Sequence, residues 1–179
     1  LSSPSHSITS SASGALGDMG QVAVAPLISV LRATEDDDVA AHAAFALRDL
    51  GADAAVAIPA LVEGLQRQDF HARRAACDAL GAIGEEPEVV VPALASALAD
   101  PASRVRQHAA RALRAYGRGA APAVPGLLRL LKDEDEDAVS AAVLTLGAIG
   151  PDASPAVPFL LARLDGESWG ERASAMTAL

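Results

Sequence analysis

Apolar positions along this chain follow the period of an α-helix. In residues 105–116 the apolar stripe consists of Val105, Ala109, Ala112, Leu113 and Tyr116, and most of the residues between them are polar. The same spacing of i, i+4, i+7, i+8 and i+11 recurs in residues 39–50. Such a stripe marks a helix that buries one face and exposes the other. The chain is therefore expected to be all-α.

The helical stripes belong to an internal repeat with a period of 33 residues. Four sets of residues share this period: Pro26, Pro59, Pro92, Pro125 and Pro158; Ala43, Ala76, Ala109, Ala142 and Ala175; Leu47, Leu80, Leu113, Leu146 and Leu179; and Gly51, Gly84, Gly117 and Gly150. A fixed period of this length is typical of stacked structural units. The expected fold is an α-solenoid, or superhelix, of antiparallel helix pairs.

Each repeat is expected to contain two helices. The first follows the periodic proline, as in VPGLLRLL from Val124, because proline in the first turn of a helix costs no hydrogen bond. The second ends at the periodic glycine, which tolerates a left-handed cap. Acidic turns lie between the two helices, such as TEDDD from Thr34 and KDEDED from Lys132. Their carboxylates are expected to cap the second helix.

The repeats are expected to form one domain over residues 1–179. Its units are a half-repeat at 1–20, full repeats at about 21–51, 52–84, 85–117 and 118–150, and a truncated repeat at 151–179. The half-repeat rests on Ile8, Ala12, Leu16 and Gly20, which match residues 39, 43, 47 and 51 with a constant offset. Since both ends fall inside a repeat, the chain is expected to come from a longer solenoid.

The sequence VRQHAARALRAYG, preceded by VPALASALADPAS, resembles a HEAT repeat of the short type that also occurs in phycobilisome lyases. The resemblance covers essentially the whole chain. It implies that the first helices line a convex side and the second helices a concave side. It also implies a ladder of aspartates and arginines between repeats, for which the matching residues are Asp100, Asp133, Arg73, Arg106 and Arg172. Ala40 and Val139 interrupt the arginine position, so the ladder is expected to be incomplete.

The segment RVRQHAARALRAYGRG, residues 104–119, contains five arginines and no acidic residue. Projected as one helix at about 100° per residue, it carries its polar side chains in a narrow sector opposite the apolar stripe: Arg104, Gln107, Arg111, Arg114 and Arg118. Arg48, His71 and Arg74 are expected to extend this patch on neighbouring helices. Arginine binds a carboxylate or phosphate through two parallel bonds, which favours a site for an acidic peptide, a protein surface or a phosphate group.

The alternative is a solvated face with charge pairs along the stack, such as Asp78 with Arg74. Phe45 and Leu144 share the repeat position of Arg111 and would face the same groove. They are either a contact patch for a partner or apolar residues that the groove wall tolerates.

Four further features were weighed as sites. His42 and His108 share one repeat position, but alanine follows each, whereas HEAT-like deoxyhypusine hydroxylases hold two irons with His–Glu pairs; no metal site is expected. Cys77 occupies an apolar position, which indicates a buried thiol rather than a nucleophile or chromophore attachment site. The acidic turns at 35–38 and 133–137 are expected to cap helices rather than bind calcium. Phe70 and Trp169 are either hydrophobic staples or anchors for a partner.

Composition narrows the function classes. A net charge of −9 disfavours nucleic-acid binding, and a single cysteine excludes an internal disulfide. No apolar run reaches about 18 residues, so no membrane partner is expected. The N-terminal LSSPSHSITSS lacks the regions of a signal peptide, and a cytoplasmic location is favoured.

The function expected is a non-catalytic scaffold or adaptor that binds another protein or an acidic peptide in its concave groove, without a cofactor or metal. The expected partner-binding residues are Arg74, Arg104, Gln107, Arg111, Arg114, Arg118, Phe45 and Leu144. The resemblance leaves two alternatives: a subunit of a bilin lyase-like enzyme, and a nucleic-acid-binding HEAT-like protein.

Overall fold

The computed structural model describes residues 20–164, where helices joined by short turns are present and strands are not. The chain divides into two compact units, residues 1–86 and 87–179. The first contains η1 (Gly20–Ala23), α2 (Val24–Ala33), α3 (Asp37–Leu50), η2 (Gly51–Ala57), α4 (Ile58–Gly64) and α5 (Phe70–Ile83). The second contains α6 (Pro87–Ala97), α7 (Ser103–Arg114), η3 (Gly117–Ala123), α8 (Val124–Leu130), α9 (Glu136–Ile149), η4 (Gly150–Ala156) and α10 (Val157–Leu164).

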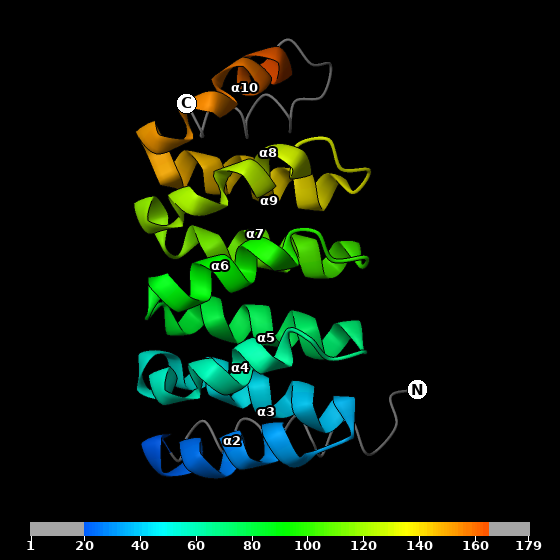
Figure 1. Ribbon diagram of the computed structural model, residues 1–179, viewed down its shortest axis with the longest axis vertical. Helices are drawn as coiled ribbons and strands as arrows, with labels where there is room; N and C mark the ends of the chain where they lie inside the picture. The colour runs from blue at the N-terminus through cyan, green and yellow to red at the C-terminus, as the bar shows by residue number, and fades with distance from the viewer. Residues whose placement is uncertain (1–19, 165–179) are drawn as a thin grey trace. The chain divides into compact units, whose positions relative to one another are not determined.

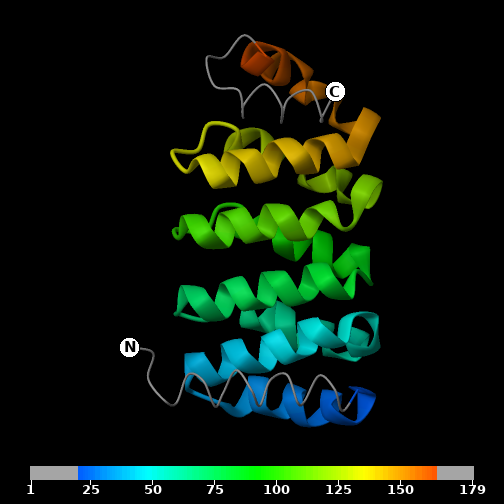
Figure 2. The same cartoon turned by 180° about the vertical axis from the view of Figure 1, so that it is seen from behind.

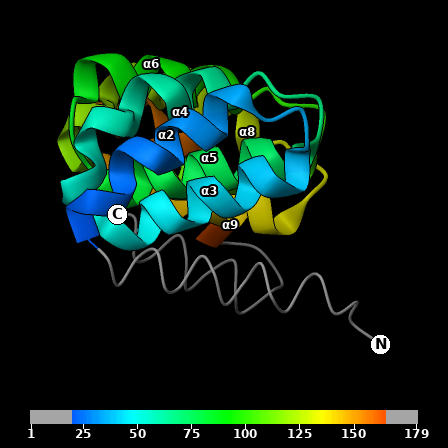
Figure 3. The same ribbon diagram turned by 90° about the horizontal axis from the view of Figure 1, so that it is seen from below.

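Each unit consists of two helical layers. In the first unit, α2 and α4 form one layer and α3 and α5 the other, as the views in Figures 1 and 3 show. In the second unit, α6 and α8 lie in front of α7 and α9 in Figure 1, and Figure 2 shows α7 and α9 from the opposite side. Helices pack within each pair and against the equivalent helix of the next pair. The predicted all-α solenoid of antiparallel helix pairs is confirmed.

The periodic residues of the second helices form the core. Leu47, Leu80 and Leu113 are fully buried, and the periodic alanines beside them are at most 4 % exposed. Alanine at these positions lets neighbouring helices approach closely, while the leucines fill the space between the layers. Cys77 is also fully buried, which confirms the prediction of a structural thiol.

The helix ends follow the predicted pattern with two exceptions. Gly51, Gly84 and Gly150 have positive φ angles and end α3, α5 and α9 as predicted. The expectation that α7 runs to Gly117 is wrong, because α7 ends at Arg114. There the amides of residues 115 and 116 donate to carbonyls three residues earlier, which tightens the last turn into 3₁₀ geometry.

The second exception is a proline. Pro59 and Pro125 lie in the first turn of α4 and α8 as predicted, but Pro92 lies inside α6. Helix α6 begins one turn earlier, at Pro87, in place of the 3₁₀ segment that precedes α4 and α8. Because Glu88 is exposed, water can satisfy its carbonyl, which has no N–H partner at Pro92.

Acidic side chains cap three of the second helices. Asp36 accepts from the amides of residues 38 and 39, Asp69 from those of residues 71 and 72, and Asp135 from that of residue 138. Helix α7 lacks such a cap, and Asp100 instead accepts from the amide of Ala102 before the helix starts. The capping role predicted for the acidic turns is therefore confirmed for α3 and α9.

One described stretch, Glu136–Ala162, is long and apolar enough to span a membrane by length and composition. It comprises three elements, because Gly150 has a φ of 73° between α9 and η4. Leu146 and Ile149 are each 1 % exposed, inside the packing of the second unit. The apolar residues of α9 are thus core positions, whereas Val157, Phe159 and Leu161 of α10 are exposed.

The predicted half-repeat at 1–20 lies almost entirely outside the described residues, as do Trp169 and Arg172. The single domain and the repeat bounds given above stay predictions.

Candidate functional site

One rung of the predicted ladder joins α7 to the turn before α9. Arg106 donates from Nε and Nη2 to the two carboxylate oxygens of Asp133, both at 2.7 Å. Its Nη1 donates to the carbonyls of Asp100 and Pro101 at 2.9 and 3.2 Å. The hydrogen bond from Arg106 lowers the pKa of Asp133, and the same bond raises the pKa of Arg106. Since the two side chains are only 19 % and 12 % exposed, this rung is largely shielded from water and holds neighbouring repeats together.

A second rung has its charges exchanged. Arg67 occupies the repeat position of Asp100 and Asp133, and Ala40 occupies the position of Arg106. Arg67 Nη1 lies 2.8 Å from Asp37 Oδ1, and its Nη2 donates to the carbonyls of residues 31 and 34 at 2.9 and 2.7 Å. Here the arginine comes from the turn and reaches back to the previous repeat. The gap at Ala40 was predicted, whereas the arginine at the aspartate position was not.

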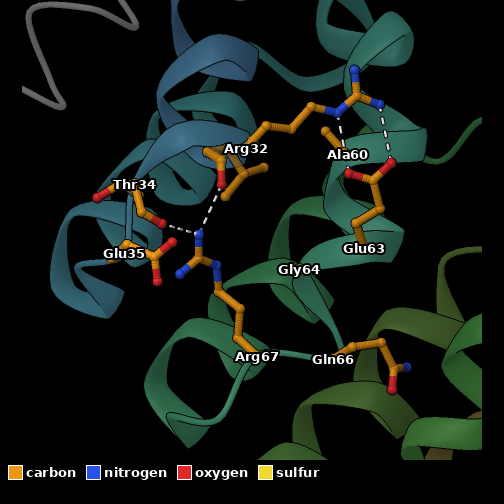
Figure 4. A pocket seen from close by; sticks show the side chains of 9 residues that line it. Arg32, Thr34, Glu35, Ala60, Glu63, Gly64, Gln66 and Arg67 are labelled. Atoms are coloured by element: carbon orange, nitrogen blue, oxygen red, sulfur yellow. Dashed lines mark hydrogen bonds and ion pairs between the residues drawn. The ribbon is translucent and has the colours of Figure 1, made fainter.

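A cavity of about 310 Å³ lies between the C-terminal ends of α2 and α4, with Arg67 in its wall (Figure 4). On the other wall Arg32 forms a two-bond ion pair with Glu63, at 3.1 and 3.2 Å. Both guanidinium groups therefore already have acceptors within the protein. The cavity therefore lies where two repeats pack together, and its arginines serve that packing.

Two arginines of the predicted patch have acidic partners from the following repeat. Arg104 Nη1 lies 3.2 Å from Asp137 Oδ2 and 3.0 Å from Gln107 Oε1. Arg118 lies in η3, beyond the end of α7, so its assignment to one helical face with Arg104 is wrong. Its Nε lies 2.7 Å from Asp152 Oδ2, and this hydrogen bond lowers the pKa of the aspartate. Aspartates distant in sequence thus neutralise part of the positive charge of residues 104–119, a segment that contains no acidic residue.

The other two arginines of this face of α7 have no partner within the described residues. Arg111 and Arg114 are exposed on α7, and neither has a hydrogen bond or ion pair within residues 20–164. Gln107, one turn before Arg111, is half-buried. Leu144 is half-buried on α9, which packs against α7, at the repeat position of Arg111. The structure therefore leaves two unpaired cations beside a partly exposed apolar side chain.

The first unit has a corresponding cluster around Phe45. The Arg48 guanidinium carbon lies 5.1 Å from the centre of the Phe45 ring, and that of Arg74 lies 5.7 Å from it. His42 meets the ring edge-on, with centroids 6.5 Å apart. Arg74 makes no ion pair with Asp78 among the described residues, so the charge pair given above as an alternative is not present there. We call the solvent-facing sides of α3 and α5, and of α7 and α9, the second-helix face of each unit.

The other candidate residues from the sequence have partners close by in the chain. His42 Nδ1 lies 2.6 Å from the carbonyl oxygen of Asp38. Phe70 is the first residue of α5, after the Asp69 cap, and its ring stacks on that of His71 at 4.0 Å. A staple residue precedes the cap, so the staple interpretation of Phe70 is wrong.

The chain matches known proteins at the level of family and fold. The profile of HEAT repeats matches residues 24–114 and 91–179, and no curated protein matches the chain. A designed armadillo repeat protein in complex with peptide (KR)4 has a TM-score of 0.74 at 17% identity, covering 98% of this chain and 93% of that chain. The CpcE and CpcF complex of phycocyanin lyase from Nostoc sp. PCC7120 gives 0.65 at 24%, covering 88% and 98%. Kap121p bound to Pho4p gives 0.76 at 20%, covering 88% and 19%.

Proposed function

This chain belongs to the HEAT-repeat family, and we propose that it is a non-catalytic scaffold that binds an acidic peptide segment of another protein on its second-helix face. Stacked repeats of this family build an extended surface because no single repeat buries its own apolar face. The observation that carries the proposal is the exposed pair Arg111 and Arg114, which has no acidic partner within the described residues.

An acidic peptide suits these arginines despite the net charge of −9. Charges separated by more than about 8 Å are largely screened at physiological ionic strength, so the local balance of charge decides the contact. Asp133 and Asp137 are engaged by Arg106 and Arg104. A carboxylate that pairs with Arg111 or Arg114 displaces only water, whereas at Arg104 or Arg118 it must replace an aspartate.

The structural neighbours support a peptide or protein as the partner. The designed armadillo repeat protein holds the peptide (KR)4, and Kap121p holds Pho4p. Both share the solenoid fold with this chain at no more than 20% identity. The sign of the peptide charge is inferred from Arg111 and Arg114, not from those complexes.

A lyase-like role has weaker support. The likeness to the CpcE and CpcF complex, at 24% identity, concerns the fold. Cys77 is fully buried, so its thiol is not accessible for attachment of a chromophore. The test is to incubate this chain with a bilin and the bilin-acceptor protein. Formation of a pigmented acceptor would establish a lyase-like role instead.

The test is a titration of a fluorescein-labelled peptide of four Asp-Glu repeats, followed by anisotropy. We expect the Arg111→Gln/Arg114→Gln variant to bind about five- to thirtyfold more weakly, since each exposed charge pair contributes roughly 0.5–1 kcal/mol. The matched control is Arg129→Gln/Lys132→Gln, which removes the same two charges from exposed positions on α8 and just after it. Equal loss in both variants would mean that only overall charge matters and would overturn the proposal.

A further inference from the structure

Two guanidinium groups lie close to the Phe45 ring on the second-helix face of the first unit. Arg48 comes from the same helix, one turn later, and Arg74 comes from α5, which packs against α3. Phe45 is half-buried, so part of its ring remains open to solvent. A guanidinium near an aromatic ring keeps its N–H groups directed outward in its own plane. The ring therefore fixes two cations without using the groups that bind carboxylates.

Arg74 is the less satisfied of the two cations. Its Nε is buried and has no hydrogen-bond partner among residues 20–164. Its Nη groups are not buried in this way, and no described residue accepts from them. A buried donor without an acceptor is costly, and its guanidinium gains from an anionic oxygen supplied at the exposed edge. Arg74 is therefore held in place by packing with its Nη edge available.

The surrounding acidic groups do not occupy that edge. Asp49 accepts from Arg48 Nε and Nη2 at 2.9 and 2.7 Å, which offsets the charge of Arg48. Asp78 stands one turn after Arg74 and takes part in another interaction. The cluster therefore keeps one uncompensated positive charge, beside a partly exposed aromatic surface.

We infer that Phe45, Arg48 and Arg74 form a subsite for one glutamate or aspartate side chain of the acidic peptide; this rests on the function proposed above. The carboxylate binds end-on to the two Nη groups of Arg74, and the methylene carbons of the same side chain lie on the open part of the Phe45 ring. Arg48, which pairs with Asp49, also contacts the ring, at 5.1 Å from its centre. A basic peptide is less well matched, because Phe45, Arg48 and Arg74 offer no acceptor and the Asp49 carboxylate already accepts from Arg48.

The test uses the phenylalanine rings as reporters. The chain contains three phenylalanines, so selective ¹³C labelling of the rings gives a small set of signals. The Phe45→Leu variant assigns the Phe45 signal, while Phe159, on α10, serves as the internal control. Titration of the full chain with unlabelled (DE)4 peptide is expected to shift the Phe45 signal saturably.

Three variants separate the subsite from general charge effects. Arg74→Ala is expected to raise the half-saturating peptide concentration at Phe45 about tenfold, as loss of a charge-assisted hydrogen bond implies. Arg74→Lys keeps the charge but loses the planar fork, and it is also expected to weaken peptide binding at Phe45. Arg129→Ala, on the other layer, is expected to leave the half-saturating peptide concentration at Phe45 unchanged. Unchanged circular dichroism at 222 nm in the absence of peptide verifies that each variant is folded.

The outcomes distinguish this inference from the proposed function. If anisotropy detects peptide binding that depends on Arg111 and Arg114 while the Phe45 signal stays still, the subsite is wrong and the proposed function stands. Equal shifts at Phe45 with (DE)4 and (KR)4, or an Arg74→Ala titration identical to wild type, also overturn the subsite. Absence of any (DE)4 binding by anisotropy overturns both.

Discussion

The rung between Arg106 and Asp133 makes a quantitative prediction about how the repeats are held together. Replacing Arg106 by glutamine removes two charge-assisted hydrogen bonds to Asp133 and two bonds to backbone carbonyls. Loss of one partner from a buried ion pair costs about 3–5 kcal/mol, and the 19 % and 12 % exposure of this pair indicates the lower end. We therefore expect Arg106→Gln to lower the free energy of unfolding by about 3 kcal/mol.

The assay is urea unfolding followed by circular dichroism at 222 nm. With an m-value of about 2 kcal/mol/M, the midpoint of Arg106→Gln should fall by roughly 1.5 M. The matched control is Arg104→Gln, the same change two residues earlier on the same helix. Arg104 also pairs with an aspartate of the next repeat, but the two side chains are 57 % and 62 % exposed, so its effect should stay within about 0.5 kcal/mol. Equal midpoints for the two variants would refute the claim that burial makes the rung stabilising.

The same rung gives a dependence on pH. Arg106 holds the pKa of Asp133 below its usual value in the folded protein. The stability that comes from this lowered pKa is fully present above the usual aspartate pKa and is lost as the pH falls through the folded-state pKa. The difference in unfolding free energy between wild type and Arg106→Gln should therefore shrink only in strong acid. A difference that instead disappears near neutral pH would contradict the assignment to Asp133.

Three further predictions concern the repeat packing. Arg67→Gln should lower the unfolding free energy by about 2 kcal/mol because it removes the exchanged rung, and Ala40→Arg/Arg67→Asp should recover at least half of that loss in the same urea assay. Gly64→Ala should raise stability by about 0.5–1 kcal/mol, since the added Cβ meets Ala76 Cβ at an ordinary 3.5 Å within a helix. Gly126→Ala should lower the melting temperature, because its Cβ would lie 2.8 Å from Leu98 Cδ1.

The fold was predictable because the same pattern of buried and exposed positions recurs in every repeat. Leu47, Leu80 and Leu113 are buried at one repeat position, and each deviation between repeats is averaged out by the others. The 33-residue period does not show where a helix of one repeat ends at a different position from its equivalents. Helix α7 ends three residues before Gly117, owing to local hydrogen bonding by residues 115 and 116. For that reason the wheel projection extended too far and included Arg118.

The candidate site was predictable only as a set of residue types. Arg111 and Arg114 are exposed as the helical projection implies. Pairing could not be deduced from one segment, because Arg104 and Arg118 find their aspartates about one period later, at residues 137 and 152. The signal was nevertheless present in the repeat alignment, since an acid at those positions faces an arginine on the neighbouring helix.

Selection of an acidic peptide by the second-helix face can be measured directly. The most direct measurement compares the dissociation constants of the wild-type chain for fluorescein-labelled (DE)4 and (KR)4 at one physiological ionic strength. Tighter binding of (DE)4 by at least about tenfold, a difference of about 1.4 kcal/mol, is the predicted result. Equal or tighter binding of (KR)4 would contradict it, since the net charge of −9 would then outweigh the unpaired arginines.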